Sequence, residues 1–518
     1  MSESQVQPNI IVIMLDDMGF SDIGCFGAEI ETPHLDRLGR GGLRFSQFYN
    51  AARCCPTRAS ILTGLYPHQA GIGGMVGRGK TPAYQGFLSE QSQTIAEALR
   101  PAGYATCMVG KWHVGGAYAV NKPETWTVAG DAEHPLPTQR GFDRFYGTLT
   151  GAGSYWRPPT LMRQETFIDA DSTEYFYTDA LGDEAATMIR ETPAGQPLFM
   201  YMTPTAPHWP LHARPADIEK YRGRYTAGWD VLRRERHERL LAEGLVKPEW
   251  GLSPRDEAAG SWVDTEHAAW EDLRMATYAA QVDNLDQNVG KLITALEETG
   301  RFADTLIVFL SDNGGCAEYL REDGDADSWP GHYAVPTVDG RPTHVGNDPG
   351  REPGPADTFM SYDLPWANAS NTPFRKFKSF VHEGGISTPF FMHWPARIQP
   401  GISHEVAHII DLQPTFCELA GATYTGATPL PGESLAALLA GEPWSRREPL
   451  YWEHFGCKGM RDGDWKLVAE RSGGSWELYH IASDRTELHD RLAEEPARAE
   501  RMTAAWQAWA DGVGVEAR

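Results

Sequence analysis

The sequence predicts an α/β fold, in which a large and mostly parallel sheet is sandwiched by helices and a smaller α+β subdomain follows at the C-terminus. Two observations support this prediction. The run from Asn9 to Leu15 is apolar and rich in β-branched residues, which is typical of a central parallel strand buried on both faces. A long amphipathic helix begins near Met275 and precedes a second buried strand, Leu306 to Leu310, and this order is typical of a βαβ unit.

The composition limits the function classes. The chain has 518 residues and a formal net charge of -24. This charge argues against nucleic acid or an anionic membrane as a partner, because a protein that binds a series of phosphate groups needs a basic face. The apolar run after residue 9 is too short for a signal peptide or a membrane span, so we expect a cytoplasmic protein. Seven scattered cysteines indicate neither a disulfide framework nor a zinc site.

Both predicted parallel strands end in polar pairs. Asp16 and Asp17 follow the first strand, and Asp312 and Asn313 follow the second. Ligand sites in open α/β sheets lie at the carboxyl ends of the strands, so we expect these four residues to share one edge. They offer only oxygen ligands, which select a hard cation. Ca²⁺ is favoured, with Mg²⁺ or Mn²⁺ as alternatives.

A short helix with a thiol at its start is predicted from residue 54 to residue 64. Pro56 suits the first turn of a helix, and Gly64 suits its end. Free backbone N–H groups and the helix dipole favour an anion beside Cys54, and Arg58, one turn later, adds a permanent cation. The alternative is a buried cysteine pair, Cys54 and Cys55, before an ordinary helix.

Two further predicted strands are followed by candidate site residues. The strand from Gly103 to Val109 precedes Lys111 and His113, which offer a compact cation and a proton acceptor near neutral pH. The strand from Leu198 to Thr203 precedes His208, which taken alone is equally consistent with a structural histidine.

The other segments complete the predicted organisation. We expect the start of a capped helix at Thr32 to Leu38 and a charged helical region at Tyr221 to Glu243. Gly141 to Gly147 is expected to be a turn-rich stretch in the wall of a cleft, and 320–370 a long surface excursion. Pro389 to Trp394 is expected to be a core strand. We expect a catalytic α/β domain at 1–423, a connector at 424–447 and the C-terminal subdomain at 448–518. The subdomain is predicted to hold hairpin strands at Leu450 to His454, Lys466 to Val468 and Trp476 to His480 and a closing helix at Pro496 to Ala510.

Several of these segments resemble motifs of the type I sulfatase family, the formylglycine-dependent arylsulfatases of the alkaline phosphatase superfamily. Residues 54–64 contain CxPxR followed three residues later by LTG, and only Cys54 has the proline and the arginine at the required offsets. Gly110, Lys111 and His113 resemble the second family signature. Residues 371–378 resemble NTPxRxxK, which adds Lys378, and residues 383–385 resemble EGG. The resemblance covers most of residues 9 to 420 and implies an alkaline-phosphatase-like fold.

The resemblance implies a nucleophile made after translation. A formylglycine-generating enzyme acting on the nascent chain would oxidise Cys54 to Cα-formylglycine, whose hydrated aldehyde attacks sulfur. Arg58 is implied to stabilise that hydrate. A single divalent cation is implied, because lysines take the place of a second metal ion near the anion. Its implied ligands are Asp16, Asp17, Asp312 and Asn313.

The resemblance also implies the groups that handle the sulfate ester. Lys111 and Lys378 would bind the sulfate oxygens. His113 would act as the base on the second hydroxyl of the hydrate. His208 would contact the substrate and protonate the leaving oxygen.

The implied function is hydrolysis of a small-molecule sulfate ester, with aryl sulfates accepted. Two alternatives stay open. One is a phosphonate monoester or phosphodiester hydrolase built on the same formylglycine site. The other is a non-catalytic anion-binding protein that never acquires the aldehyde.

Overall fold

The central element of the fold is a ten-stranded sheet. The computed structural model describes residues 7–77, 79–321, 331–471 and 473–516. Within these ranges the strands of the sheet, in their order across it, are β13 (Gly401–Ser403), β2 (Leu43–Phe45), β12 (Phe390–His393), β9 (Thr305–Ser311), β1 (Asn9–Leu15), β8 (Leu198–Thr203), β4 (Ala105–Lys111), β5 (Arg144–Thr148), β6 (Leu161–Arg163) and β7 (Thr166–Phe167).

The centre of this sheet is parallel. β1 lies between β8 and β9 and is parallel to both, and β4 continues the parallel arrangement between β8 and β5. β12 runs antiparallel to its neighbours β9 and β2, and β6 and β7 form an antiparallel edge. The predicted α/β fold with a mostly parallel sheet is confirmed.

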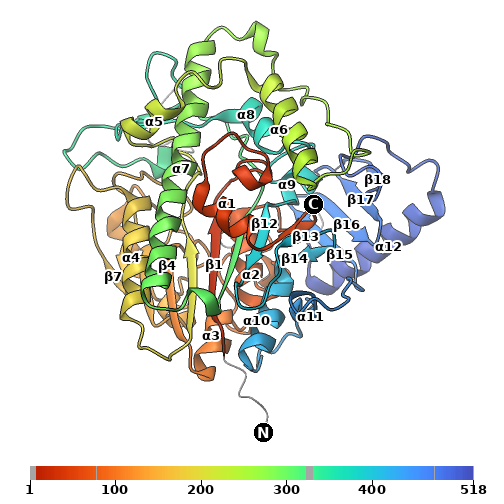
Figure 1. Cartoon of the computed structure of the whole chain (residues 1–518), viewed down its shortest axis with the longest axis horizontal. Coiled ribbons are helices and arrows are strands. Elements are labelled where there is room, and N and C mark those ends of the chain that lie inside the picture. Colours follow the sequence, from red (N-terminus) through yellow and green to blue (C-terminus); the bar gives the residue numbers. More distant parts are fainter. Residues whose placement is uncertain (1–6, 78, 322–330, 472, 517–518) are drawn as a thin grey trace.

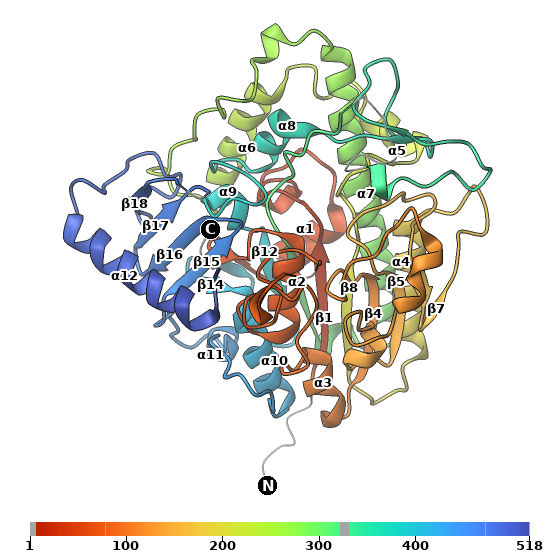
Figure 2. The ribbon, with the colours of Figure 1, turned by 180° about the vertical axis from the view of Figure 1, so that it is seen from behind.

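Helices cover both faces of the sheet (Figures 1 and 2). The alternation along β1 shows why, since Ile11 and Ile13 belong to one core cluster and Ile10 and Val12 to the other. On the first face lie α1 (Pro33–Arg40), α4 (Tyr177–Glu191) and α7 (Ala268–Glu298). On the second face lie α2 (Cys54–Thr63), α3 (Ile95–Leu99) and α10 (Leu412–Ala420). Both faces of β1 are thereby covered, and all seven of its residues are buried.

Shorter elements complete the larger unit. Two small parallel pairs are formed by β3 (Phe48–Tyr49) with β14 (Ala407–His408), and by β10 (His344–Val345) with β11 (Thr358–Phe359). The remaining helices before the C-terminal sheet are α5 (Pro215–Tyr221), α6 (Trp229–Glu243), α8 (Asp363–Ser370), α9 (Glu383–Ile386) and α11 (Ala436–Leu439).

A separate antiparallel sheet follows near the C-terminus, as predicted. Its strands are β15 (Leu450–His454), β16 (Cys457–Asp462), β17 (Trp465–Ala469) and β18 (Trp476–His480). The helix α12 (Pro496–Val513) packs against it through an apolar cluster that includes Met460, Leu478 and Trp506. In Figure 1 this sheet and α12 lie to one side of the large sheet.

Three predictions about local structure need correction. The stretch from Gly141 to Gly147 is not only turn, because β5 occupies its second half and buries Phe145 and Tyr146 in the cores on opposite faces of the sheet. The glycines at its two ends gave it the appearance of a turn. No strand was predicted at Cys457–Asp462, where the structure has β16.

The predicted surface excursion at 320–370 is also partly wrong. Residues 322–330 lie outside the described part of the chain, but the rest includes β10, β11 and α8. Trp366 and Phe359 in this stretch are fully buried. Its many Pro, Gly and Asp residues concealed this contribution to the core.

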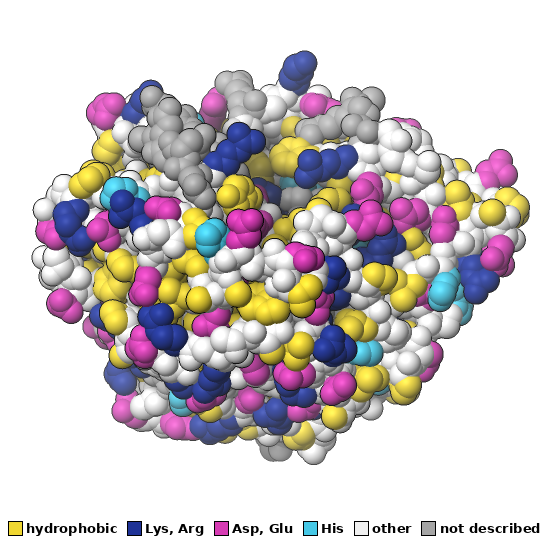
Figure 3. All heavy atoms as spheres, turned by 90° about the horizontal axis from the view of Figure 1, so that it is seen from above, with side chains coloured by type: hydrophobic (Ala, Val, Ile, Leu, Met, Phe, Trp, Pro, Cys, Tyr) yellow, Lys and Arg dark blue, Asp and Glu magenta, His cyan; other side chains and the backbone are white. Residues whose placement is uncertain are grey.

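The surface carries mixed charge. On the face seen in Figure 3, Lys and Arg side chains are interspersed with Asp and Glu and form no continuous basic area among the residues described. None of the helices in the described ranges combines the length and the apolar character that a bilayer crossing requires.

Candidate active site

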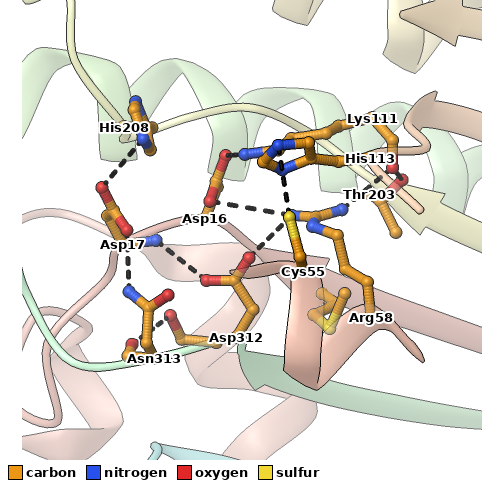
Figure 4. A network of polar contacts seen from close by, with 12 residues as sticks. Asp16, Asp17, Cys55, Arg58, Lys111, His113, Thr203, His208, Asp312 and Asn313 are labelled. Carbon is orange, nitrogen blue, oxygen red and sulfur yellow. Dashed lines mark hydrogen bonds and ion pairs between the residues drawn. The ribbon is translucent and has the colours of Figure 1, made fainter. Parts of the chain in front are cut away.

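The ends of β1 and β9 bring the two predicted polar pairs together. Leu15 and Ser311 are register partners in these parallel strands, so the residues that follow them meet at one edge. The backbone N–H of Asp17 donates to Asp312 Oδ1 at 3.2 Å, and Asn313 Nδ2 donates to Asp17 Oδ1 at 2.7 Å (Figure 4). The expected common edge is therefore present.

These residues fit a hard divalent cation. Asp16, Asp17, Asp312 and Asn313 are all buried, and Asp16 Oδ1 and Asn313 Oδ1 have no hydrogen-bond partner among the described residues. Unpartnered buried oxygens are costly unless something compensates them. Burial and the neighbouring Asp312 carboxylate raise the pKa of Asp16 to about 7. A bound cation would give the unpartnered oxygens a ligand role and would offset the repulsion between Asp16 and Asp312. Carboxylate and amide oxygens are the ligands that such a cation prefers.

The helix α2 begins with Cys54 at this edge. Its N-cap residue, Arg53, is extended, and the helix ends at Gly64, whose φ of 64° is accessible to glycine without strain. A hydrogen bond from the Cys55 thiol and the charge of Lys111 hold the pKa of Cys54 well below its usual range, although burial opposes them. The position thus favours an anion, as the sequence predicted.

Cys55 also reaches the site. Its Sγ lies 3.3 Å from His113 Nε2, and the ligand atoms of Cys54, Cys55 and His113 all lie within 4.8 Å of one another. Burial lowers the pKa of His113 to about 4, so its imidazole is neutral and able to accept a proton at neutral pH.

Arg58 and Lys111 connect α2 and β4 to the carboxylates. Arg58 Nη2 lies 2.8 Å from Asp312 Oδ2, and its Nη1 donates to the Lys111 carbonyl oxygen at 2.9 Å. Lys111 Nζ lies 2.5 Å from Asp16 Oδ2. Figure 4 shows these three contacts converging on the same edge of the sheet.

A second group of contacts surrounds Asp17. Lys378 Nζ lies 2.8 Å from Asp17 Oδ2 and 3.3 Å from His208 Nε2. His208 Nδ1 is 2.7 Å from the Trp209 carbonyl oxygen, and because a carbonyl only accepts, Nδ1 carries the proton. Burial lowers the pKa of His208. Burial opposes the charge on Lys378, but the negative groups around it, Asp17 foremost, together outweigh burial and raise the pKa of Lys378 well above its usual value.

The structure thus brings all of the predicted site residues to one place, from six separate segments. It places the carboxylates and Asn313 at the ends of β1 and β9, and it places the cations and histidines on α2, β4, the loop after β8 and the loop before α9.

Comparison with known proteins identifies the family. The family model described as Sulfatase matches residues 8–422 of this chain. The chain belongs to the sulfatase family. A second model, described as N-sulphoglucosamine sulphohydrolase, C-terminal, matches residues 374–507. This membership makes the chain a sulfuric ester hydrolase, as the motifs predicted.

The similarity to known sulfatases covers most of this chain. An arylsulfatase of Klebsiella aerogenes is 32% identical over 86% of this chain and 95% of its own length. An uncharacterized sulfatase of Schizosaccharomyces pombe is 31% identical over 98% of this chain and 94% of its own length. Among solved structures, Ps i-CgsB has a TM-score of 0.68 at 25% identity and covers 97% of this chain and 92% of its own.

Sequence reasoning missed three residues of this sulfatase site. Arg53 and Glu318 form an ion pair of 2.8 Å beside Lys378. His454, at the end of β15, is fully buried, and neither of its ring nitrogens has a partner among the described residues. Burial lowers its pKa to about 3, and a charge on Cys54 would be close enough to oppose this. Arg53 directly precedes the cysteine motif, but no spacing rule pointed to Glu318 or His454.

Proposed function

We propose that this sulfatase hydrolyses sulfate esters, aryl sulfates among them, with a formylglycine nucleophile derived from Cys54. One observation carries the proposal. Cys54 begins α2 where Arg58, Lys111 and His113 converge, beside a group of buried oxygen ligands. The similarity to an arylsulfatase supports the inclusion of aryl sulfates.

Residue 54 would act as a hydrated aldehyde. One hydroxyl attacks sulfur and expels the alcohol, and deprotonation of the other hydroxyl then breaks the C–O bond to sulfate and restores the aldehyde, so water need not attack a sulfated enzyme. Cys54 Sγ stands in this structure where an oxygen of the hydrate would lie. We expect a formylglycine-generating enzyme to make the modification on the nascent chain.

Asp16, Asp17, Asp312 and Asn313 would hold one divalent cation, with Ca²⁺ favoured. Such a cation lowers the pKa of a nearby hydroxyl and offsets negative charge on the transferring group. Arg58 holds Asp312 in place through its 2.8 Å ion pair and supplies a further positive charge beside residue 54.

The lysines and histidines would handle the sulfate and the protons. Lys111 and Lys378 offset the charge that develops on the sulfate oxygens. His113 is neutral and accepts the proton of the second hydroxyl. His208 would protonate the leaving oxygen from Nε2, and the Asp17 carboxylate, whose Oδ2 lies 3.3 Å from Nε2, favours the protonated imidazole.

Mass and rate measurements test the proposal. Expressed together with a formylglycine-generating enzyme, the chain should lose about 18 Da at residue 54, because a thiol CH₂SH becomes an aldehyde. The converted enzyme with Ca²⁺ should cleave nitrophenyl sulfate faster than phenylphosphonate esters.

Cys54→Ala should abolish both the mass change and the activity, whereas the matched Cys55→Ala variant should keep the mass change. An unconverted, inactive chain would instead support an anion-binding protein, and a strong preference for the phosphonate would support the rival hydrolase.

A further inference from the structure

A partly buried carboxylate outside the family motifs, that of Glu318, lies beside Lys378. Glu318 Oε2 is 3.6 Å from Lys378 Nζ and accepts a 2.8 Å hydrogen bond from Trp209 Nε1. Its other oxygen, Oε1, lies 2.8 Å from Arg53 Nη2, and the Cys316 thiol donates to Oε2 at 3.3 Å. Four side chains therefore fix the position of this carboxylate.

The Arg53–Glu318 pair lies on the solvent side of the site. The Arg53 and Glu318 side chains are 15% and 18% exposed, whereas those of Lys378 and Asp17 are 2% and 1% exposed. Arg53 is also the residue directly before Cys54. This pair is therefore the more solvent-accessible part of the surroundings of residue 54 and Lys378.

Glu318 is a permanent negative charge. Burial favours its neutral form, but the positive charges of Lys378 and Arg53 outweigh burial and hold the pKa of Glu318 well below its usual range. The charge of Lys378 is accordingly shared between Asp17, Glu318 and the incoming anion. A more negative anion meets stronger repulsion from Glu318, since Coulomb energy scales with charge.

We propose that Glu318 is a specificity-determining residue that favours singly charged sulfate esters over doubly charged phosphate monoesters. A sulfate monoester carries one negative charge, whereas a phosphate monoester, with a second pKa of about 6, carries close to two at pH 8. The two groups are similar in shape, so charge is the property by which this site can separate them. The inference rests on the proposed function and assigns the charge selectivity of the same site.

Glu318→Gln tests this directly. The amide has nearly the same shape and can still accept the hydrogen bond from Trp209 Nε1. The converted holoenzyme is assayed at pH 8 with 4-nitrophenyl sulfate and 4-nitrophenyl phosphate. We expect the ratio of kcat/KM for phosphate to kcat/KM for sulfate to rise about tenfold, because one negative charge near the substrate is removed. An unchanged or smaller ratio overturns the inference.

A charge-compensating pair of variants separates charge from shape. Arg53→Met removes a positive charge and should lower the phosphate-to-sulfate ratio. The double variant, Arg53→Met with Glu318→Gln, should bring the ratio back toward that of the wild type, because the local net charge is restored. A purely structural role predicts that the double variant loses activity on both substrates equally, without this return. Arg53→Met also keeps the test decisive if Glu318→Gln does not fold.

Two controls distinguish this inference from the proposed function. Intact mass must show equal conversion of residue 54 in every variant, because Arg53 is adjacent to the modified residue. A wild-type enzyme that is converted but does not cleave the sulfate ester contradicts the proposed function itself. A wild-type enzyme that cleaves it, combined with an unchanged ratio in Glu318→Gln, overturns only the role of Glu318.

Discussion

Arg58 and Asp312 form an ion pair that is closed to solvent, with Nη2 2.8 Å from Oδ2 and both side chains 0% exposed. Arg58 comes from α2 and Asp312 follows β9, so the pair fixes α2 to the edge of the sheet where β1 and β9 end. The attraction must offset the cost of removing both charges from water. The pair therefore links the stability of the fold to the geometry of the site.

Arg58→Met should destabilise the metal-free protein by about 3–5 kcal/mol, because it leaves Asp312 buried without its partner. Urea unfolding in EDTA measures this loss. Arg58→Lys is the matched control, since it keeps the charge but lacks the second bond to the Lys111 carbonyl, and we expect a smaller loss. Equal stability of Arg58→Met and wild type would contradict the role given to this pair.

Removing the metal should lower the thermal midpoint. Asp16, Asp17 and Asp312 lie close together, and without a cation their charges repel. A ligand at a hundred times its Kd stabilises the folded state by about 2.7 kcal/mol. Calorimetry in EDTA and after addition of Ca²⁺ checks this effect. Asp312→Asn should reduce the response to Ca²⁺, and a midpoint that does not respond to Ca²⁺ in the wild type would argue against a metal site here.

The common edge of Asp16, Asp17, Asp312 and Asn313 was predictable from the sequence, because a local pattern and a general rule of α/β sheets were sufficient. A buried strand that ends in acidic residues is visible in the letters, and the pairing of Leu15 with Ser311 is what parallel neighbours require. The roles of Lys378 and His208 came from the family resemblance instead, since a lone lysine or histidine in a loop has no distinctive spacing.

The residues that were missed depend on tertiary contacts between distant segments. Glu318 acquires its place from Trp209, Arg53 and Lys378, which are far apart in the chain. His454 reaches the neighbourhood of Cys54 only because the C-terminal sheet docks there, where Trp452 Nε1 donates to the Asn50 carbonyl oxygen at 2.7 Å. No periodicity or motif encodes such contacts.

A buried ion cluster joins the C-terminal sheet to the larger unit, and it yields a stability prediction. Lys466 Nζ on β17 lies 2.9 Å from Glu383 Oε1 on α9 and 2.8 Å from Glu487 Oε1, and all three side chains are 0% exposed. Lys466→Met should cost about 3–5 kcal/mol because it leaves Glu487 buried without its cation and leaves Glu383 with Arg485 alone. Lys291→Met is the matched control, since its ion pair with Asp183 lies at the surface and should contribute less than about 1 kcal/mol. Urea unfolding of both variants decides, and equal losses would contradict the prediction.

His212 should make the fold sensitive to acid. The Tyr155 backbone N–H donates to its Nδ1 at 3.2 Å, and its Nε2–H donates to the Thr358 carbonyl oxygen at 2.6 Å, so the buried imidazole is held neutral. Burial lowers its pKa to about 4 in the folded state, whereas the unfolded value is about 6.5. The folded pKa is depressed, so between pH 6.5 and pH 4 the unfolded chain binds a proton that the folded chain does not. Stability from this group is complete above pH 6.5 and is lost as the pH falls toward 4. At pH 5 the loss should be about 2 kcal/mol relative to pH 7.5.

Urea unfolding of the wild type and of His212→Gln, each at pH 5 and pH 7.5, isolates this contribution from other titrating groups. The wild type should lose more stability on acidification than the variant, and parallel losses would show that His212 does not carry the effect.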